Sequence, residues 1–334
     1  MIGTTILFFG GDKLSLISAK PSVNDTFQTK GWASLSYSGI VDGEFVNERE
    51  IPKTIGKLLE GVRTPLMGSL VVSVPSCFCK VSVTHEKKGL LRPRKVNLHD
   101  IGELSRGGRV IYYKIDGGAP ILDAHGHMAT STIEACVSHL HVDPNFLDIV
   151  QNCYQVAKKF KRIKYLPTAL CEANHLIPSY IRDKTCVLIS CKMFTTSIAV
   201  IVGDQLASIK NIDMGSAHMI NDISIVKQVN YNIAKQMYDE MLNGTTAPDI
   251  VAIVGARLED LTEQIIALIN SIDRGLYTRP FYICGGHIDK IPTAIPMFES
   301  ALETSITQLL CPLSETNEPD LVSRNAVVSI AISS

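Results

Sequence analysis

One pattern, an apolar run followed by a tight turn and a second apolar run, occurs twice in this chain. The first copy runs from Thr4 to Ser18 around Gly10-Gly11-Asp12-Lys13, and the second runs from Cys186 to Val202 around a turn at 190–195. Short apolar runs bounded by turn residues predict β-hairpins. A hairpin at the start of each half indicates a duplicated α/β protein with two similar lobes, and we expect its ligand cleft to lie between them.

The composition limits the classes of function. The 334 residues are 46% hydrophobic and 19% charged, as in an ordinary globular protein. Because 32 Lys and Arg balance 33 Asp and Glu, no excess of positive charge favours a nucleic-acid partner, and we expect none. The nine cysteines are an odd number, and the longest uncharged apolar stretch, Met193 to Gly203, is shorter than a membrane span of about 20 residues. We therefore expect a cytoplasmic protein with reduced thiols.

Other segments have clear periodicity. Apolar residues from Ile51 to Val62 have helical spacing, and Asp143-Pro144 predicts the start of a helix whose apolar stripe continues to Ile163. Between these helices, residues 68–145 are rich in strand-forming residues and predict a small α+β insertion. The helix predicted over 258–272 precedes a strand that ends at Gly285-Gly286, an order that suits nucleotide binding. The C-terminal segment 325–332 is strand-like.

The stretch from Ser190 to Ile223 resembles a known family. Thr195-Thr196 leads into an apolar run, a Gly-Asp turn follows at 203–204, and the segments 211–216 and 220–223 complete the pattern. In order and spacing it resembles the FtsA-like bacterial cell-division proteins of the actin-like ATPase superfamily. Weaker similarities at 72–76, 116–126, 256–259 and 284–286 extend the resemblance over nearly the whole chain. It implies an α/β, two-lobed actin-like (ribonuclease H-like) duplicated fold with a small α+β insertion in the first lobe.

The position of the insertion refines this expectation. In FtsA and its pilus-assembly relative PilM, an extra α+β subdomain lies within the first lobe, and residues 68–145 occupy that place. The resemblance implies a first lobe of residues 1–67 and 146–184 and a second lobe of residues 185–334. Within the second lobe it implies a reduced helical subdomain at about 217–278.

The resemblance also implies a nucleotide site, although key residues differ. The residues that match the ATP-binding loops are Gly10, Gly11, Lys13, Thr195, Thr196, Gly215, Lys235, Gly285 and Gly286. The aspartates that hold Mg²⁺ in the superfamily correspond to Phe8 and Ser190, and the second glycine loop reads Lys192-Met193-Phe194. Hydrolysis of ATP needs a metal holder and a group that positions the attacking water. We therefore predict neither catalytic nor metal-ligating residues and a weak or lost ATPase activity, with ATP binding left open and Mg²⁺ present only if ATP binds.

For function, the resemblance implies a cytoplasmic scaffold of bacterial cell division. Its expected partners are an FtsZ-like tail or another division protein and further copies of itself, associated head to tail. It would reach the inner face of the cell membrane only indirectly, through a partner, because the strand-like C-terminus lacks an amphipathic membrane helix. Two alternatives stay open: a PilM-like scaffold of type IV pilus or secretion assembly, and an active ATPase with displaced metal ligands such as Asp12 or Asp213.

Two sets of soft ligands are interpreted as structural. Cys77 and Cys79 alternate on a predicted strand, and no second cysteine cluster at zinc spacing follows them. His125, His127, His139 and His141 could supply four imidazoles, but we expect them on loops of the insertion.

Overall fold

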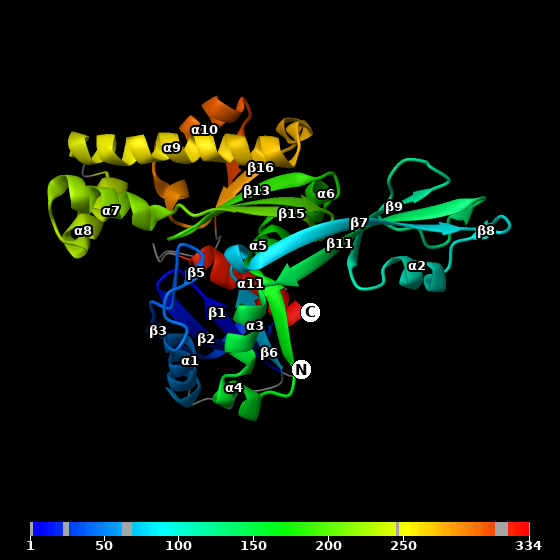
Figure 1. Ribbon diagram of the computed structural model, residues 1–334, viewed down its shortest axis with the longest axis horizontal. Helices are drawn as coiled ribbons and strands as arrows, with labels where there is room; N and C mark the ends of the chain where they lie inside the picture. The colour runs from blue at the N-terminus through cyan, green and yellow to red at the C-terminus, as the bar shows by residue number, and fades with distance from the viewer. Residues whose placement is uncertain (1–2, 23–26, 62–68, 245–246, 311–319, 334) are drawn as a thin grey trace.

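The computed structural model describes residues 3–22, 27–61, 69–244, 247–310 and 320–333. Two five-stranded sheets form the two lobes, and a three-stranded sheet projects to one side of them (Figure 1). The predicted boundary between the first lobe and the insertion, at 67/68, lies outside the described residues, but β6 (Leu70–Val74), which the prediction placed in the insertion, pairs with β1 in the first large sheet.

The two large sheets share one topology. The first has the order β12-β6-β1-β2-β3, and the second has the order β15-β14-β13-β16-β17. In each sheet an antiparallel meander of three strands is extended by two strands that run parallel to the first strand of the meander. The strands of the first sheet are β1 (Thr4–Phe9), β2 (Lys13–Pro21), β3 (Phe27–Ser36), β6 (Leu70–Val74) and β12 (Ile163–Pro167). Those of the second are β13 (Cys186–Cys191), β14 (Thr196–Val202), β15 (Gln205–Ile212), β16 (Phe281–Cys284) and β17 (Ile306–Gln308). The repeated hairpin of the sequence is thus the start of a repeated sheet.

Helices cover both faces of each sheet. The outer helices of the first lobe are α1 (Glu50–Gly61), α3 (Pro144–Gln151) and α4 (Tyr154–Lys159); those of the second lobe are α7 (Ser216–Lys227), α8 (Tyr231–Leu242), α9 (Pro248–Ile272) and α10 (Ala294–Leu302). Between the two sheets lie α5 (Thr168–Leu176) and α11 (Leu321–Ser333), which pack against each other (Figure 1). Each occupies the same place in its repeat, since α5 follows β12 and α11 follows β17. The short helix α6 (Ser179–Arg182) leads into β13, and β4 (Ile40–Val41) and β5 (Glu44–Phe45) form a small hairpin before α1.

Alternating side chains of the central strands separate the cores. In β1, Leu7 and Phe9 join the core with α1, whereas Ile6 and Phe8 join the core with α11. A strand places successive side chains on opposite faces, so a strand buried on both faces is apolar throughout. This burial explains the uninterrupted apolar run at the N-terminus. It also puts the end of β1 beside the cleft between the lobes.

The insertion follows β6 within the first lobe. Its main sheet has the order β7-β11-β9, and α2 and a two-stranded β8–β10 pair lie near its free end. The elements are β7 (Cys79–Gly89), β8 (Arg94–Lys95), α2 (Leu98–Leu104), β9 (Arg109–Ile115), β10 (Met128–Ala129) and β11 (Thr132–Val142). At its root the Ser138 hydroxyl donates to the Leu206 carbonyl at 2.6 Å, which ties the insertion to β15.

Two local predictions were wrong. The apolar stripe from 146 to 163 is divided between α3 and α4, because Cys153 has extended backbone angles and a buried side chain, and Ile163 begins β12. The strand-like segment 325–332 lies in α11, where Ala326, Val327 and Val328 pack on the first sheet. Burial against the sheet overrides the weak helix propensity of its β-branched residues.

None of the helices in the described part of the chain combines the length and the apolar character that a bilayer crossing needs.

Candidate functional site

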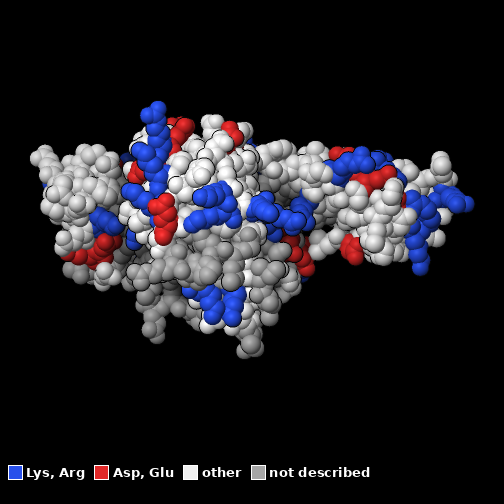
Figure 2. All heavy atoms as spheres, turned by 90° about the horizontal axis from the view of Figure 1, so that it is seen from below, with Lys and Arg blue, Asp and Glu red and all other residues white. Residues whose placement is uncertain are grey.

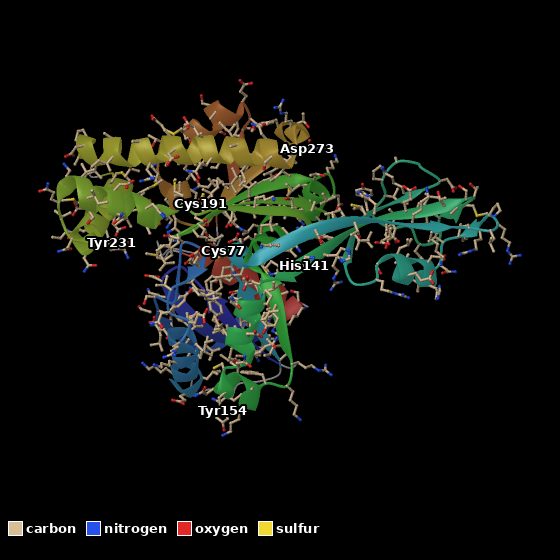
Figure 3. All side chains as sticks on the ribbon, viewed as in Figure 1. Cys77, His141, Tyr154, Cys191, Tyr231 and Asp273 are labelled. Atoms are coloured by element: carbon tan, nitrogen blue, oxygen red, sulfur yellow. The ribbon has the colours of Figure 1, made fainter. Side chains whose placement is uncertain are left out.

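The glycine turns predicted to bind a nucleotide meet between the lobes. A Cβ on Gly11 would lie 2.6 Å from Cβ of Met193, so the β1–β2 turn of one lobe touches the β13–β14 turn of the other. A Cβ on Gly215 would lie 2.4 Å from the Lys192 carbonyl oxygen, and one on Gly285 would lie 1.8 Å from that of Cys191. Cys77 and Cys191 mark this junction in Figure 3. Protein backbone approaches Gly215 and Gly285 closely, and the Met193 side chain approaches Gly11, so a side chain at any of the three would clash with the protein itself.

The space left between these turns is small. A cavity of about 60 Å³ is lined in part by Gly10, Gly11 and Thr195. A neighbouring cavity of about 90 Å³ brings Lys13 and Lys235 to the same turn. Thr196 is buried and donates from Oγ1 to the Met214 carbonyl at 2.8 Å. Because ligand pockets typically enclose roughly 300–1,000 Å³, neither cavity can hold a nucleotide as it stands. Gly215, Gly285 and Gly286 line neither of them.

Four backbone donors of the turns are engaged within the protein. The N–H of Gly11 donates to Oδ2 of Asp320 at 2.8 Å, and the N–H of Gly286 donates to Oδ1 of Asp289 at 2.8 Å. The N–H of Gly10 donates to the Lys13 carbonyl at 2.9 Å, and that of Gly215 donates to Nδ1 of His218 at 3.1 Å. Turns of this kind bind phosphate through N–H groups that point at the anion. Here protein acceptors take those bonds.

Asp320 connects the two lobes at the centre of the site. Its Oδ2 accepts from Gly11 of the first lobe, and its Oδ1 lies 3.5 Å from Nε2 of His287 in the second lobe. The other imidazole nitrogen of His287 is hydrogen-bonded to the Ser216 hydroxyl at 3.0 Å. Burial alone would raise the pKa of Asp320, but the His287 imidazole, the Lys192 ammonium and the Gly11 N–H outweigh it and lower the pKa to about 2. The carboxylate is therefore ionised and fills an anion site with a group of the protein.

A buried ion pair lies beside Asp320. The Lys192 ammonium contacts the carboxylate of Glu172, whose side chain is fully buried, and the Ser323 hydroxyl. The Ser190 hydroxyl donates to the other oxygen of Glu172 at 2.8 Å. Burial by itself would lower the pKa of Lys192, but the Glu172 carboxylate and Asp320 together raise it above its ordinary value. A permanent positive charge thus lies beside Ser190, one of the two positions where the superfamily carries a metal-holding aspartate.

The mouth of the cleft carries two carboxylates. A wider opening of about 400 Å³ lies at the mouth of the cleft, but the carboxylates of Asp12 and Asp42 line it together with His218. These carboxylates would repel a phosphate group without a metal, but they are also the kind of ligand that binds Mg²⁺. Asp12 lines this opening and Asp213 lies beside Gly43, and the alternative that either of them replaces the lost metal ligands stays a prediction.

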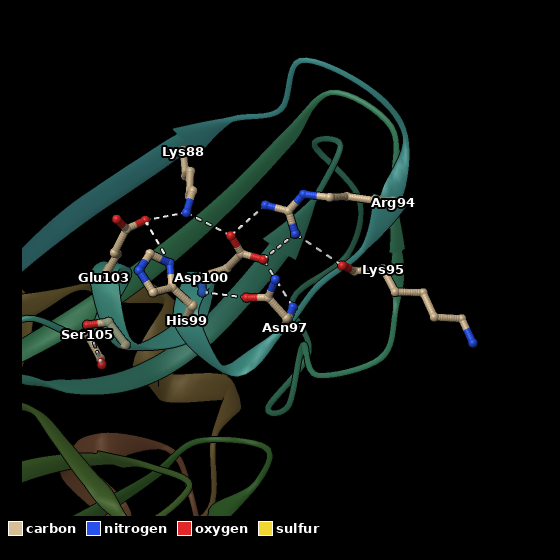
Figure 4. A network of polar contacts seen from close by, with 9 residues as sticks. Lys88, Arg94, Lys95, Asn97, His99, Asp100, Glu103 and Ser105 are labelled. Atoms are coloured by element: carbon tan, nitrogen blue, oxygen red, sulfur yellow. Dashed lines mark hydrogen bonds and ion pairs between the residues drawn. The ribbon is translucent and has the colours of Figure 1, made fainter.

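The structure corrects the predicted places of the remaining soft ligands: Cys77 lies in a short 3₁₀ helix, Ser76–Phe78, and only Cys79 lies in a strand. His139 and His141 lie in β11, and only His125 and His127 lie in a loop. Burial raises the pKa of the Cys77 thiol to about 12, which keeps it protonated. His139 bonds to the Thr84 hydroxyl at 3.0 Å and His141 to the Ser82 hydroxyl at 2.9 Å, both across the β7–β11 ladder. Among the described residues, the one group of three potential metal ligands is His99, Asp100 and Glu103 in the insertion. Its central carboxylate, Asp100, is already paired with Arg94 and Lys88 (Figure 4).

The sequence did not point to the groups that fill the site. Asp320 and Glu172 are far in sequence from the turns they serve, and neither belongs to a loop motif. Asp289 could have been suspected, since an Asp three residues after a glycine turn can cap its N–H groups.

Comparisons with known proteins define the fold. No family model matches the sequence, and no curated protein is similar to it. Solved structures do match: PilM of a PilM–PilN type IV pilus biogenesis complex has a TM-score of 0.64 at 13% identity, over 98% of this chain and 97% of the other. The ethanolamine utilization protein EutJ of Carboxydothermus hydrogenoformans has a TM-score of 0.57 at 13% identity, with 98% and 88% covered. MreB5 of Spiroplasma citri, bound to AMPPNP, has a TM-score of 0.56 at 9% identity, with 99% and 94% covered. The chain therefore has the actin-like ATPase fold, as its sequence predicted.

Proposed function

We propose that this protein is a scaffold with the actin-like fold that works without a nucleotide. One observation carries the proposal: the backbone donors of the Gly11, Gly215 and Gly286 turns are bonded to Asp320, His218 and Asp289. In MreB5 the same fold is seen with AMPPNP bound. In this chain the corresponding cleft is bridged by the protein's own charges, so the two lobes need no ligand to stay together.

A scaffold acts by binding other proteins, and one groove in the second lobe suits that role. The groove encloses about 560 Å³ between α7 and α9, and its walls include Ile225 and Val226, whose exposed fractions are 65% and 61%. At one side, Arg257 holds Asp222 through two hydrogen bonds of 2.6 and 2.8 Å. Exposed apolar side chains with fixed charges at their rim are typical of a site for a short partner segment.

Two settings fit such a scaffold. The match with PilM from a PilM–PilN complex spans nearly all of both chains, the insertion included, and favours assembly of a type IV pilus or secretion system. The FtsA-like motif at 190–223 favours cell division, with the tail of an FtsZ-like protein as the partner. We place the pilus setting first, because the structural likeness extends over the whole chain and the motif over a tenth of it.

The two settings differ in the peptide that binds. We expect a fluorescent peptide from the cytoplasmic end of an inner-membrane protein of the same genome to bind the full chain with micromolar affinity, measured by anisotropy. The FtsZ tail of that genome, tested in parallel, should not bind. The reverse result would assign the protein to cell division, and binding of neither peptide would contradict both settings.

Variants of the groove show where a peptide binds. Val226→Glu should weaken binding at least ten-fold if the peptide lies between α7 and α9. Ile233→Glu places the same charge on an exposed apolar residue of α8 and should leave binding unchanged.

A further inference from the structure

The free end of the insertion combines exposed apolar side chains with unpaired cations. The loop 90–93 joins β7 to β8, and the side chain of Leu91 in it is fully exposed. In the β8–β10 ladder Met128 is paired with Lys95, and its side chain is 61% exposed. Single exposed apolar residues are ordinary, but here one lies in the loop directly before β8, the other lies in β10 and pairs with β8, and β8 lies at the free end of the projecting domain (Figure 1).

The charge of the insertion differs in sign from the rest of the chain. Residues 79–142 contain nine Lys and Arg and six Asp and Glu, a net charge of +3, whereas the whole chain carries −1 and the remainder therefore −4. Figure 2 shows Lys and Arg side chains gathered at the free end of the projecting domain. An anionic surface would attract this end and repel the rest of the molecule.

Internal pairing leaves particular cations available at this end. Asp100 is held by Arg94 at 2.6 and 2.7 Å and by Lys88 at 2.7 Å (Figure 4), and Lys87 pairs with Glu134 at 2.8 Å. Within the described residues, the side chains of Arg92 and Lys95 are exposed and make no ion pair. The acidic groups near the loop are therefore largely neutralised, and these two charges remain.

Contacts at both ends of the loop 90–93 hold it away from the core of the insertion. The N–H of Leu90 donates to the Ser131 carbonyl at 2.8 Å at one end of the loop, and the Arg94–Asp100 pair fixes the other end to α2. Because both ends are anchored, Leu91 cannot fold back onto the small core of the insertion. A leucine held in water between cations is suited to the interface of an anionic bilayer, where the apolar side chain enters and the cations contact the headgroups.

We propose that the free end of the insertion is a contact site for anionic membranes, made by Leu91 and Met128 with Arg92 and Lys95. The protein then touches the membrane directly, in addition to any attachment through a partner. Each unpaired cation near an anionic surface adds roughly five-fold to partitioning, and burial of one leucine adds about ten-fold or more. One such site binds weakly, so neighbouring copies on the same surface would strengthen binding through avidity.

Vesicle sedimentation of the full chain tests this proposal. The protein should pellet with vesicles of phosphatidylcholine and 30% phosphatidylglycerol, and less with phosphatidylcholine alone. Arg92→Ser with Lys95→Ser should reduce partitioning at least ten-fold, and Leu91→Ser should reduce it to a similar degree. Raising NaCl from 0.1 to 0.5 M should reduce the partitioning of the wild type onto the anionic vesicles, because salt screens the attraction between the cations and the headgroups.

Matched variants keep the test specific. Lys161→Ser with Arg162→Ser removes the same charge from an exposed turn of the first lobe, and Leu310→Ser removes an exposed leucine elsewhere. Both should pellet like the wild type, and all variants should melt at the same temperature. The proposal is overturned if the wild type does not pellet, if control and tip variants lose binding equally, or if Arg92 and Lys95 bind a polyglutamate peptide and not the vesicles.

Discussion

The backbone N–H of Gly11 donates a 2.8 Å hydrogen bond to the carboxylate of Asp320, across 309 residues of sequence. The turn that the sequence resemblance assigns to a nucleotide thus faces an aspartate of the protein itself. Asp320 also contacts His287, which follows the Gly285-Gly286 turn. A single carboxylate therefore links the β1–β2 turn of the first lobe with the turn after β16 in the second. The closed cleft is therefore a property of the polypeptide.

Asp320 should make the free energy of unfolding depend on pH at acidic pH. Its folded pKa of about 2 lies below the ordinary value near 4, so its contribution is fully present above about pH 4 and is lost as the pH falls towards 2. The contribution is about 2 kcal/mol. Urea unfolding measured between pH 5 and 2 should show this loss in the wild type, and the slope in that window should be smaller in Asp320→Asn. An unchanged slope would mean that Asp320 is not the group that titrates.

The buried pair of Lys192 and Glu172 should be costly to break from one side. Glu172→Gln leaves a buried ammonium without its counter-charge, and we expect a loss of about 3–5 kcal/mol in the free energy of unfolding. Lys192→Met combined with Glu172→Met removes both charges and should recover most of that loss. Urea denaturation of Glu172→Met, Lys192→Met and the double variant measures this coupling. Additive losses would show that the pair does not act as a unit.

Two glycines offer opposite tests of backbone packing. Gly285 has φ of +137°, and a Cβ there would lie 1.8 Å from the Cys191 carbonyl oxygen. Gly285→Ala should therefore destabilise the protein severely, by more than about 3 kcal/mol. Gly255 lies within α9, and beyond its own stretch of helix no heavy atom lies within 4 Å of the place that a Cβ would take, so Gly255→Ala should stabilise by up to about 1 kcal/mol. Thermal melting distinguishes the two, and equal effects would contradict the close packing at Gly285.

Asp100 should control the order of the insertion's free end. The Arg94 guanidinium, with the Lys88 ammonium, outweighs burial and holds the pKa of Asp100 well below its usual range. Its contribution is present above about pH 4 and falls at lower pH. Asp100→Asn should accelerate amide hydrogen exchange in β8 and α2 without changing exchange in the two large sheets. Glu86→Gln, at an exposed acid nearby, should leave exchange at β8 unchanged.

The sequence predicted the duplicated architecture because hairpins are encoded locally. The apolar runs of β1 and β13 are strands buried on both faces, and the intervening turns are marked by glycine or polar residues. The repeat also implies a helix after β17, because α5 follows β12, the corresponding strand of the first sheet. The β-branched residues of α11 pointed the other way, and tertiary packing decided the outcome.

The site was predicted only in outline. Local motifs located the glycine turns, and the loss of metal binding expected from Phe8 and Ser190 stays a prediction. The groups that close the cleft, Asp320 and Glu172, meet the turns only after the chain has folded. Their role depends on burial and on long-range hydrogen bonds, which leave no periodic pattern in a single sequence.

The most direct test of the central claim is calorimetric titration of the purified protein with ATP and Mg²⁺, combined with thermal melting in the same buffer. A ligand that binds only the native state must raise its melting temperature. We expect neither binding heat nor a shift of the melting temperature up to millimolar ATP, because Asp320, His218 and Asp289 already take the donors of the turns. Micromolar binding with a raised melting temperature would contradict the account.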